Sequence, residues 1–153
     1  MMGMLEREKK IEVLVVEDSQ DDSELTELAL VHAKDNIQFI HFSNGADALN
    51  FIFGKKKYEG EEVKTGLKLV LLDIGLPAIS GLEVLKKIRG EYATRMLPVV
   101  MLTSSMDEKD MQMAYEFGAN SYVVKPNGFE GYVKKISSLA FYWSCVNEKP
   151  YPT

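Results

Sequence analysis

The chain has few of the residues from which disulfide frameworks and thiolate or imidazole metal sites are built. Its 153 residues include one cysteine, Cys145, and two histidines. A single thiol excludes a disulfide within the chain and a metal site made of cysteines, and a passive free thiol suits the reducing cytoplasm. His32 and His41 fall inside a predicted helix and a predicted strand, away from the strand ends. We therefore expect both histidines to be structural or surface residues.

Positive charge is also scarce. The sequence has 18 lysines and arginines against 23 aspartates and glutamates, which gives a formal net charge of −5. Nucleic-acid binding requires clustered cationic side chains, so this charge argues against a nucleic-acid partner. No apolar run is long enough to cross a membrane, and the start MMGMLEREKK lacks the apolar core of a signal peptide. The sequence therefore predicts a cytoplasmic protein with no export signal and no membrane partner.

What the chain does have is a regular alternation of short apolar runs and helical patterns. The runs predict five strands, at residues 11–16, 37–42, 69–73, 97–103 and 121–124. Nearly continuous apolar strands that alternate with helices are typical of a parallel sheet with helices on both faces. Five such units predict a flavodoxin-like, doubly wound α/β fold with strand order 2-1-3-4-5.

The length suits a single domain. We expect this domain to span 11–146, between an N-terminal extension at 1–10 and a C-terminal tail at 147–153. Residues 54–66, GKKKYEGEEVKTG, are charged, punctuated by glycine and aperiodic, so they predict a mobile surface loop.

The last predicted helix is apolar on more than one face. One stripe suffices to cover the sheet, and it consists of Phe129, Val133, Ile136, Ala140 and Trp143. Further apolar residues extend beyond the stripe, namely Leu139, Phe141, Tyr142, Cys145 and Val146. Such a helix usually buries its extra surface against a partner, so we expect a homodimer through this helix and the C-terminal aromatics. The alternative is that the tail folds back on its own domain.

Polar residues follow four of the five strands. In an open α/β sheet, ligands bind beyond the carboxyl ends of the strands, near the switch in strand order. The residues at these ends are Glu17-Asp18, Asp73, Thr103-Ser104 and Lys125. Because the first, third and fourth strands are neighbours in the predicted order and the fifth flanks them, we expect these side chains to converge on one edge of the sheet.

Three converging carboxylates repel one another unless a cation lies among them. Oxygen ligands without histidine or cysteine suit Mg²⁺, or Mn²⁺. We expect Asp18 and Asp73 to be direct ligands and Glu17 to bind directly or through water. The backbone carbonyl of Gly75 would lie close enough to join them.

A carboxylate beside a divalent cation can act as a nucleophile towards phosphorus and form an aspartyl phosphate. Asp73 would be this nucleophile, Lys125 would hold a phosphoryl oxygen, and the Thr103 hydroxyl would donate to another. A flavodoxin would need neutral phosphate-binding donors after the first strand, where this chain has EDSQDD, so bound FMN is disfavoured. We interpret Asp21 and Asp22 as ordinary helix N-terminal charge.

Two capping boxes support this arrangement of loops. Ser80-x-x-Glu83 and Ser105-x-x-Glu108 each predict the start of a helix a few residues beyond a site-bearing strand. Neither G-x-G-x-x-G nor G-x-x-x-x-G-K-[ST] occurs, so no dinucleotide or P-loop site is indicated.

The motifs VEDS, LLDIGLPAISG, VVMLTSS and GANSYVVKP, in this order, resemble the response-regulator receiver domain of two-component signalling over roughly residues 11–143. The resemblance implies that Asp73 is the phospho-acceptor, that Glu17 and Asp18 hold Mg²⁺, and that Lys125 is the phosphoryl clamp. It also implies that Thr103 is the switch hydroxyl and Tyr122 the aromatic whose rotamer follows the switch. A cis peptide bond between Lys125 and Pro126 is a further expectation from the family.

The insertion before the third strand, the TSS motif and the tail FYWSCVNEKP look like stand-alone receivers that partner bacterial phytochrome histidine kinases. We thus expect a phospho-acceptor, rather than an enzyme, that receives its phosphoryl group from a sensor histidine kinase and signals by contact with a downstream protein. Two alternatives stay open. One is a scaffold that binds without phosphorylation, and the other is a haloacid-dehalogenase-type hydrolase, which is disfavoured because Gly75 stands where such enzymes carry a second acid.

Overall fold

The computed structural model describes residues 10–150 and contains one five-stranded parallel sheet with strand order β2-β1-β3-β4-β5. The strands are β1 (Val13–Val16), β2 (Phe39–Phe42), β3 (Leu69–Leu72), β4 (Val99–Thr103) and β5 (Ser121–Val124). The helices are α2 (Gln20–Ala33), α3 (Gly45–Phe53), α4 (Gly81–Gly90), α5 (Glu108–Glu116) and α6 (Phe129–Phe141), with a short 3₁₀ turn η1 (Lys56–Tyr58) and a π-helical turn η2 (Tyr142–Val146). The predicted fold class and strand order are confirmed.

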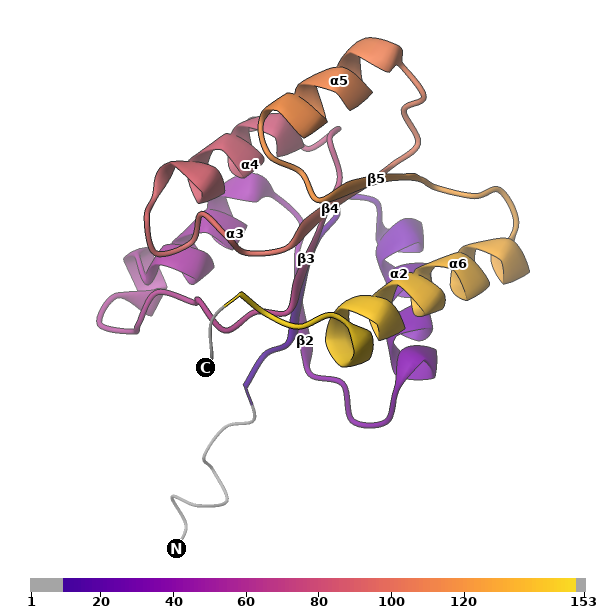
Figure 1. Ribbon diagram of the computed structural model, residues 1–153, viewed down its shortest axis with the longest axis horizontal. Coiled ribbons are helices and arrows are strands. Elements are labelled where there is room, and N and C mark those ends of the chain that lie inside the picture. Colours follow the sequence, from indigo (N-terminus) through magenta and orange to yellow (C-terminus); the bar gives the residue numbers. More distant parts are fainter. Residues whose placement is uncertain (1–9, 151–153) are drawn as a thin grey trace, which may run out of the picture.

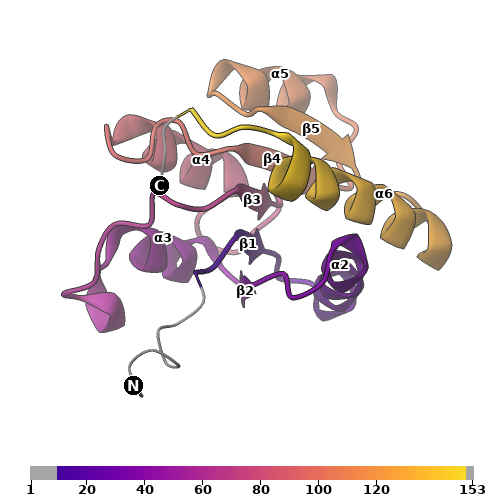
Figure 2. The same ribbon diagram turned by 60° about the horizontal axis from the view of Figure 1, so that its bottom comes forward.

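The helices form two layers around the sheet. Helices α3, α4 and α5 cover one face, and α2 and α6 cover the other (Figures 1 and 2). Side chains along β1 alternate between the layers, because Leu14 and Val16 belong to the first core and Val13 and Val15 to the second. Both faces are therefore apolar, which explains why the strands are continuous apolar runs. No helix within residues 10–150 is long and apolar enough to cross a membrane.

The predicted surface loop at 54–66 is held to the body of the protein. The Tyr58 ring packs edge-on against Phe51, with centroids 5.2 Å apart, and also contacts Phe42. The backbone N–H of Lys64 donates to the carbonyl of Ile52 at 2.7 Å. An aromatic contact and a hydrogen bond thus fix both halves of a segment whose composition suggested only a loop.

The two predicted capping boxes have different outcomes. The Ser80 hydroxyl accepts from the N–H of Glu83 at 3.3 Å, so the first is confirmed as the start of α4. The second is wrong, because Asp107 is the N-cap of α5 and accepts from the N–H of Lys109. The Ser105 hydroxyl instead donates to Asp110 at 2.7 Å. Aspartate caps a helix as well as serine does, and it stands two residues closer to the helix start.

Helix α6 faces the sheet with a stripe that differs from the predicted one. Ile136 and Ala140 are fully buried as expected, but Phe129 is 58% exposed and Tyr132 is buried in its place. The Tyr132 hydroxyl lies 2.9 Å from that of Thr26 on α2, so burial leaves no unpaired polar atom there. Apolar periodicity alone cannot choose a tyrosine over a phenylalanine three residues earlier, because the choice depends on a partner hydroxyl on another helix.

Part of the C-terminal segment folds back on the domain. Leu139 and Trp143 pack against the α2–α6 core, and the Lys68 ammonium donates to the carbonyl of Ser144 at 3.2 Å. Phe141, Tyr142 and Val146 stay about half exposed. The alternative that the tail folds back on its own domain is therefore confirmed in part, and the segment still presents an apolar surface to solvent.

The tightest constraint on the loop between β3 and α4 is at Gly81. A Cβ atom at Gly81 would overlap the backbone carbonyl of Asp73, whereas at Gly90, on the same helix, it would meet nothing within 4 Å. We expect Gly81→Ala to lower the free energy of unfolding by about 1–3 kcal/mol, because backbone cannot move aside as a side chain can.

The matched control Gly90→Ala removes a glycine from the same helix without a clash. We expect it to leave stability unchanged or to raise it by at most about 1 kcal/mol. Urea unfolding of both variants tests this, and equal stabilities would mean that the approach of Gly81 to Asp73 is not a constraint.

Candidate metal centre

Three carboxylates gather at the carboxyl ends of β1 and β3. One oxygen each from Glu17, Asp18 and Asp73 lies within 4.8 Å of the others. The parallel register brings them together, because Val16 pairs with Leu72 and the next residues of both strands are acids. Glu17 and Asp73 are buried and Asp18 is exposed. Hard oxygen donors with one side open to solvent fit a divalent cation such as Mg²⁺ that keeps several waters.

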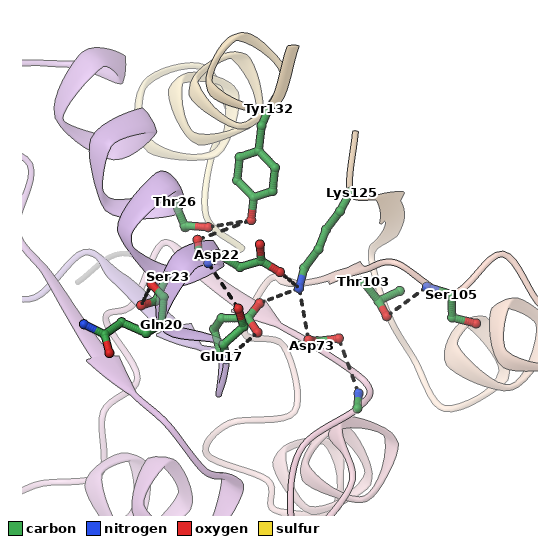
Figure 3. Close-up of polar contacts among 12 residues, drawn as sticks. Glu17, Gln20, Asp22, Ser23, Thr26, Asp73, Thr103, Ser105, Lys125 and Tyr132 are labelled. Carbon is green, nitrogen blue, oxygen red and sulfur yellow. Dashed lines mark hydrogen bonds and ion pairs between the residues drawn. The ribbon is translucent and has the colours of Figure 1, made fainter. Parts of the chain in front are cut away.

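A buried lysine completes the cluster. The Lys125 ammonium, which follows β5, lies 2.7 Å from Glu17, 2.8 Å from Asp22 and 3.1 Å from Asp73 (Figure 3). Burial by itself lowers the pKa of Lys125, but the hydrogen bonds with Asp22 and Glu17 and the surrounding negative charge raise it above its usual value. Lys125 is therefore a fixed positive charge among acids at this edge of the sheet.

The ionised form of Glu17 is disfavoured by burial. Burial raises the pKa of Glu17 from 4.5 to about 7, and the Asp73 charge adds to the effect. Lys125 and the N–H of Ser19, which donates to Glu17 at 3.1 Å, oppose the increase. A divalent cation would favour the ionised form, so metal binding and deprotonation of Glu17 are linked.

The two oxygens of Asp73 have different partners. Oδ2 accepts from Lys125, and Oδ1 accepts from the backbone N–H of Gly75 at 3.3 Å. Gly75 has no neighbour within 4 Å of where a Cβ would lie, and it is not among the glycines with positive φ. The backbone of position 75 thus contributes to the site through its N–H, and its conformation does not require glycine.

Thr103 and Tyr122 meet at the loop that follows β4. The Thr103 hydroxyl is buried and accepts from the N–H of Ser105 at 3.3 Å. The Tyr122 hydroxyl donates to the carbonyl of Ser105 at 3.0 Å. Burial, and the nearby charges of Asp110 and Asp107, raise the pKa of Tyr122. The predicted switch pair is therefore connected through one residue.

Two residues at the site were given other roles from the sequence. His41 was expected to lie away from the strand ends, but its Nε2 lies 2.7 Å from the backbone carbonyl of Glu17. The register of β2 against β1, in which His41 pairs with Val15, places the ring beside this carbonyl. Asp22 was interpreted as helix N-terminal charge, and it also binds Lys125.

The cis peptide bond expected before Pro126 is not found, since all described peptide bonds are trans. The chain turns into α6 two residues later instead, where Gly128 has φ +90° and serves as the N-cap. A positive φ of this kind is readily adopted by glycine.

The raised pKa of Glu17 predicts how pH changes the stability of the metal-free protein. Keeping Glu17 protonated contributes stability that is fully present below its unfolded pKa of 4.5 and is lost as pH rises through about 7. In a chelator, we expect the free energy of unfolding to fall between pH 5 and pH 8 by at most about 3 kcal/mol. Mg²⁺ at pH 8 should restore part of the loss, because the cation binds the ionised carboxylate.

Glu17→Gln is the matched control for this measurement, because it keeps both histidines and removes only the titrating acid. Its stability should change much less over the same pH window, as measured by urea unfolding. Parallel curves for the two proteins would assign the pH dependence to other groups.

Comparisons with known proteins agree with this geometry. Residues 13–137 match the family described as the response regulator receiver domain. The chain is 32% identical over 149 residues to the probable methanogenesis regulatory protein FilR2 of Methanothrix harundinacea, covering 97% of this chain and 94% of the relative. It is 31% identical over 131 residues to the response regulator Rcp1 of Synechocystis sp., covering 86% of this chain and 87% of Rcp1.

Solved structures give the same result. The Mn²⁺-bound form of Rcp1 has a TM-score of 0.82 at 30% identity, over 91% of this chain and 98% of that one. The bacteriophytochrome response regulator RtBRR has a TM-score of 0.71 at 39% identity, over 93% of this chain and 85% of that one. The likeness to regulators that are paired with phytochromes is thus confirmed as a similarity. The chain therefore belongs to the response regulator receiver domain family.

Proposed function

We propose that this protein is a response regulator that accepts a phosphoryl group on Asp73 from a phosphohistidine of a sensor histidine kinase, in a reaction that requires Mg²⁺. The observation that carries the proposal is the environment of Asp73. One of its oxygens accepts from Lys125 at 3.1 Å, and an oxygen of its carboxylate lies within 4.8 Å of those of Glu17 and Asp18. A nucleophile, a cation site and a phosphoryl-binding ammonium share one edge of the sheet.

The chemistry follows from these contacts. A carboxylate oxygen of Asp73 forms a bond to phosphorus while the bond from phosphorus to the imidazole nitrogen of the donor breaks. Glu17, Asp18, Asp73 and the Gly75 carbonyl would hold Mg²⁺ or Mn²⁺, which would neutralise charge at the phosphoryl oxygens. Lys125 moves its contact from the Asp73 carboxylate to a phosphoryl oxygen, where its positive charge matches the charge that arrives.

The response to phosphorylation begins at Thr103. Its hydroxyl now accepts from the N–H of Ser105, and it turns to donate to a phosphoryl oxygen. Tyr122 is bound to the carbonyl of the same Ser105, so it follows the movement of the loop. Ligand contacts that differ between two states are what shift such an equilibrium. The surface of α5, β5 and α6 then changes, with Tyr115 exposed on α5 and Met106 exposed on the loop before it, and signals by contact with a downstream protein.

The similarity to RtBRR, a bacteriophytochrome response regulator, supports a phytochrome-type histidine kinase as the partner. Cys145 is an exposed free thiol, which fits the reducing cytoplasm where such a kinase domain would have access to ATP. The chain acts as a phospho-acceptor and does not turn over an external substrate. A hydrolase of the haloacid-dehalogenase type is disfavoured because Gly75 offers no acid two residues after the nucleophile.

Phosphorylation of Asp73 can be measured directly. We expect incubation with Mg²⁺ and acetyl phosphate to add one phosphoryl group to the intact protein by mass spectrometry, and we expect no adduct with Asp73→Asn or in the presence of a chelator. Asp73→Asn keeps the shape of the side chain and removes the nucleophile. An unmodified wild-type protein that also fails to bind beryllofluoride, a phosphoryl analogue, would rule out phospho-acceptance and leave the phosphorylation-independent scaffold.

We also propose that the protein forms a homodimer through α6 and the C-terminal aromatics. Phe141, Tyr142 and Val146 are 46%, 46% and 52% exposed, and all three come from one continuous stretch of α6 and η2. Adjacent exposed apolar side chains of this kind are typical of protein interfaces. Another copy of the chain offers a surface of the same character, as a two-fold symmetric contact requires.

The dimer is tested by Phe141→Glu, which places a charge in the centre of this surface. We expect the variant to sediment as a monomer at concentrations where the wild type is a dimer, because an unpaired charge cannot be buried without a large cost. The control is Val31→Glu, which changes an exposed valine on α2 that is 61% accessible. A wild-type protein that is monomeric with and without beryllofluoride would refute the dimer.

A further inference from the structure

Asp22 contacts the clamp lysine without belonging to the metal cluster. Its Oδ2 lies 2.8 Å from the Lys125 ammonium, closer than Asp73 does at 3.1 Å (Figure 3). The group of acids that could hold a metal contains Glu17, Asp18 and Asp73 but not Asp22. The Lys125 side chain is almost fully shielded from solvent, at 8% exposed, whereas that of Asp22 is 32% exposed.

The Asp22 backbone is fixed in the first turn of α2. Its N–H donates to the hydroxyl of Ser19, the N-cap of the helix, and the N–H of Ser19 donates to Glu17. Since Glu17 and Asp22 both accept from Lys125, these four residues form a closed ring of hydrogen bonds. The ring sets the direction from which Asp22 approaches the ammonium.

Helix α6 fixes Asp22 from the other side. The Tyr132 hydroxyl lies 2.9 Å from the hydroxyl of Thr26 and 3.4 Å from the carbonyl of Asp22, to which it donates (Figure 3). Tyr132 is 3% exposed and Thr26 is 1% exposed, so this contact is held inside the α2–α6 core. Asp22 is thus restrained at its N–H, its carbonyl and its carboxylate by three different elements.

Metal binding and phosphorylation would affect the three contacts of Lys125 differently. An ammonium has three N–H donors, and here Glu17, Asp22 and Asp73 accept them. A cation bound by Glu17 would compete with Lys125 for that carboxylate, and a phosphoryl group on Asp73 would accept the Lys125 N–H that the Asp73 carboxylate now accepts. Asp22 is the remaining carboxylate partner, and neither metal binding nor phosphorylation requires it to move.

We propose that Asp22 is a positioning residue for the phosphoryl group: it holds the Lys125 ammonium against a phosphoryl oxygen while Glu17 and Asp73 serve the metal and the phosphoryl group. This inference rests on the proposed function. It predicts that the contribution of Asp22 to phosphoryl binding passes entirely through Lys125. The neighbouring Asp21 is exposed in the same helical turn and is not among the ion-pair partners of Lys125 within residues 10–150, so it makes no such contribution.

The test measures beryllofluoride affinity at saturating Mg²⁺ by calorimetry. We expect Asp22→Ala to weaken binding about tenfold, as loss of a charge-assisted hydrogen bond does. Asp21→Ala removes the same charge from the same turn, and we expect it to change the affinity by less than about twofold. Thermal unfolding shows whether the alanine variant is folded. If it is not, Asp22→Asn replaces it in the same measurement.

A double-mutant cycle separates positioning from a general loss of structure. In a Lys125→Ala background, Asp22→Ala should cause no further loss of beryllofluoride affinity, because the group that it positions is gone. Equal losses in both backgrounds, or equal behaviour of Asp22→Ala and Asp21→Ala, would overturn the inference. A wild-type protein that binds no beryllofluoride would instead refute the proposed function itself, so the two failures are distinct.

Discussion

The ammonium of Lys125 among three carboxylates is the interaction on which the rest of the site depends. A parallel sheet brings the ends of its strands to one edge, and in this chain that edge carries Glu17, Asp18 and Asp73. Buried carboxylates without a counter-charge would be strongly destabilising. Lys125 reaches the two buried ones, Glu17 and Asp73, from the end of β5, beyond the intervening β4, which only a long side chain can do. The fold therefore creates the repulsion and also supplies the charge that offsets it.

The site is connected to both layers of helices. On one side, the β4–α5 loop joins Thr103 to Tyr122 through Ser105, next to α5. On the other, Asp22 joins Lys125 to α2, and through Tyr132 to α6. Two short routes of hydrogen bonds thus reach the helices, one from Thr103 to Tyr122 and one from Asp73 through Lys125 to Asp22. The first passes through a loop and the second through the start of a helix that is packed along its length.

The sequence was a good guide where one physical rule dominated. Strand order followed from alternating apolar runs, and the site followed from the rule that strand ends meet at one edge. Both rules act over the whole sheet, so errors of two residues in the strand limits did not matter. The residues that sequence reasoning misplaced depend on a single partner. Asp22 needed Lys125, 103 positions away, and Tyr132 needed Thr26, 106 positions away.

Contacts between such distant residues produce no periodic pattern in the sequence. An acid in the first turn of a helix is explained adequately by the helix dipole, so nothing local indicates a second role for Asp22. His41 is a similar case, because its contact is with a backbone carbonyl and any residue at position 17 provides one. Ser105 fits the sequence pattern of a capping box, but the residue that caps α5 in the structure is Asp107. Local patterns of this kind offer alternatives that only the tertiary structure decides.

The close approach of Gly81 to the carbonyl of Asp73 has a consequence for how this chain tolerates changes of length. Because α4 begins against the backbone of the acceptor, the seven residues between them form a loop of fixed span, with Ala78 at φ +64°. Before β3, the loop at 54–66 is anchored near both ends but exposed at residues 59–62, and a Cβ at Gly60 would meet nothing. Gly60 itself has φ +94°, which favours glycine, so reporter groups or inserted segments belong at its exposed neighbours Glu59 and Glu62, upstream of the strand that carries the acceptor and not downstream of it.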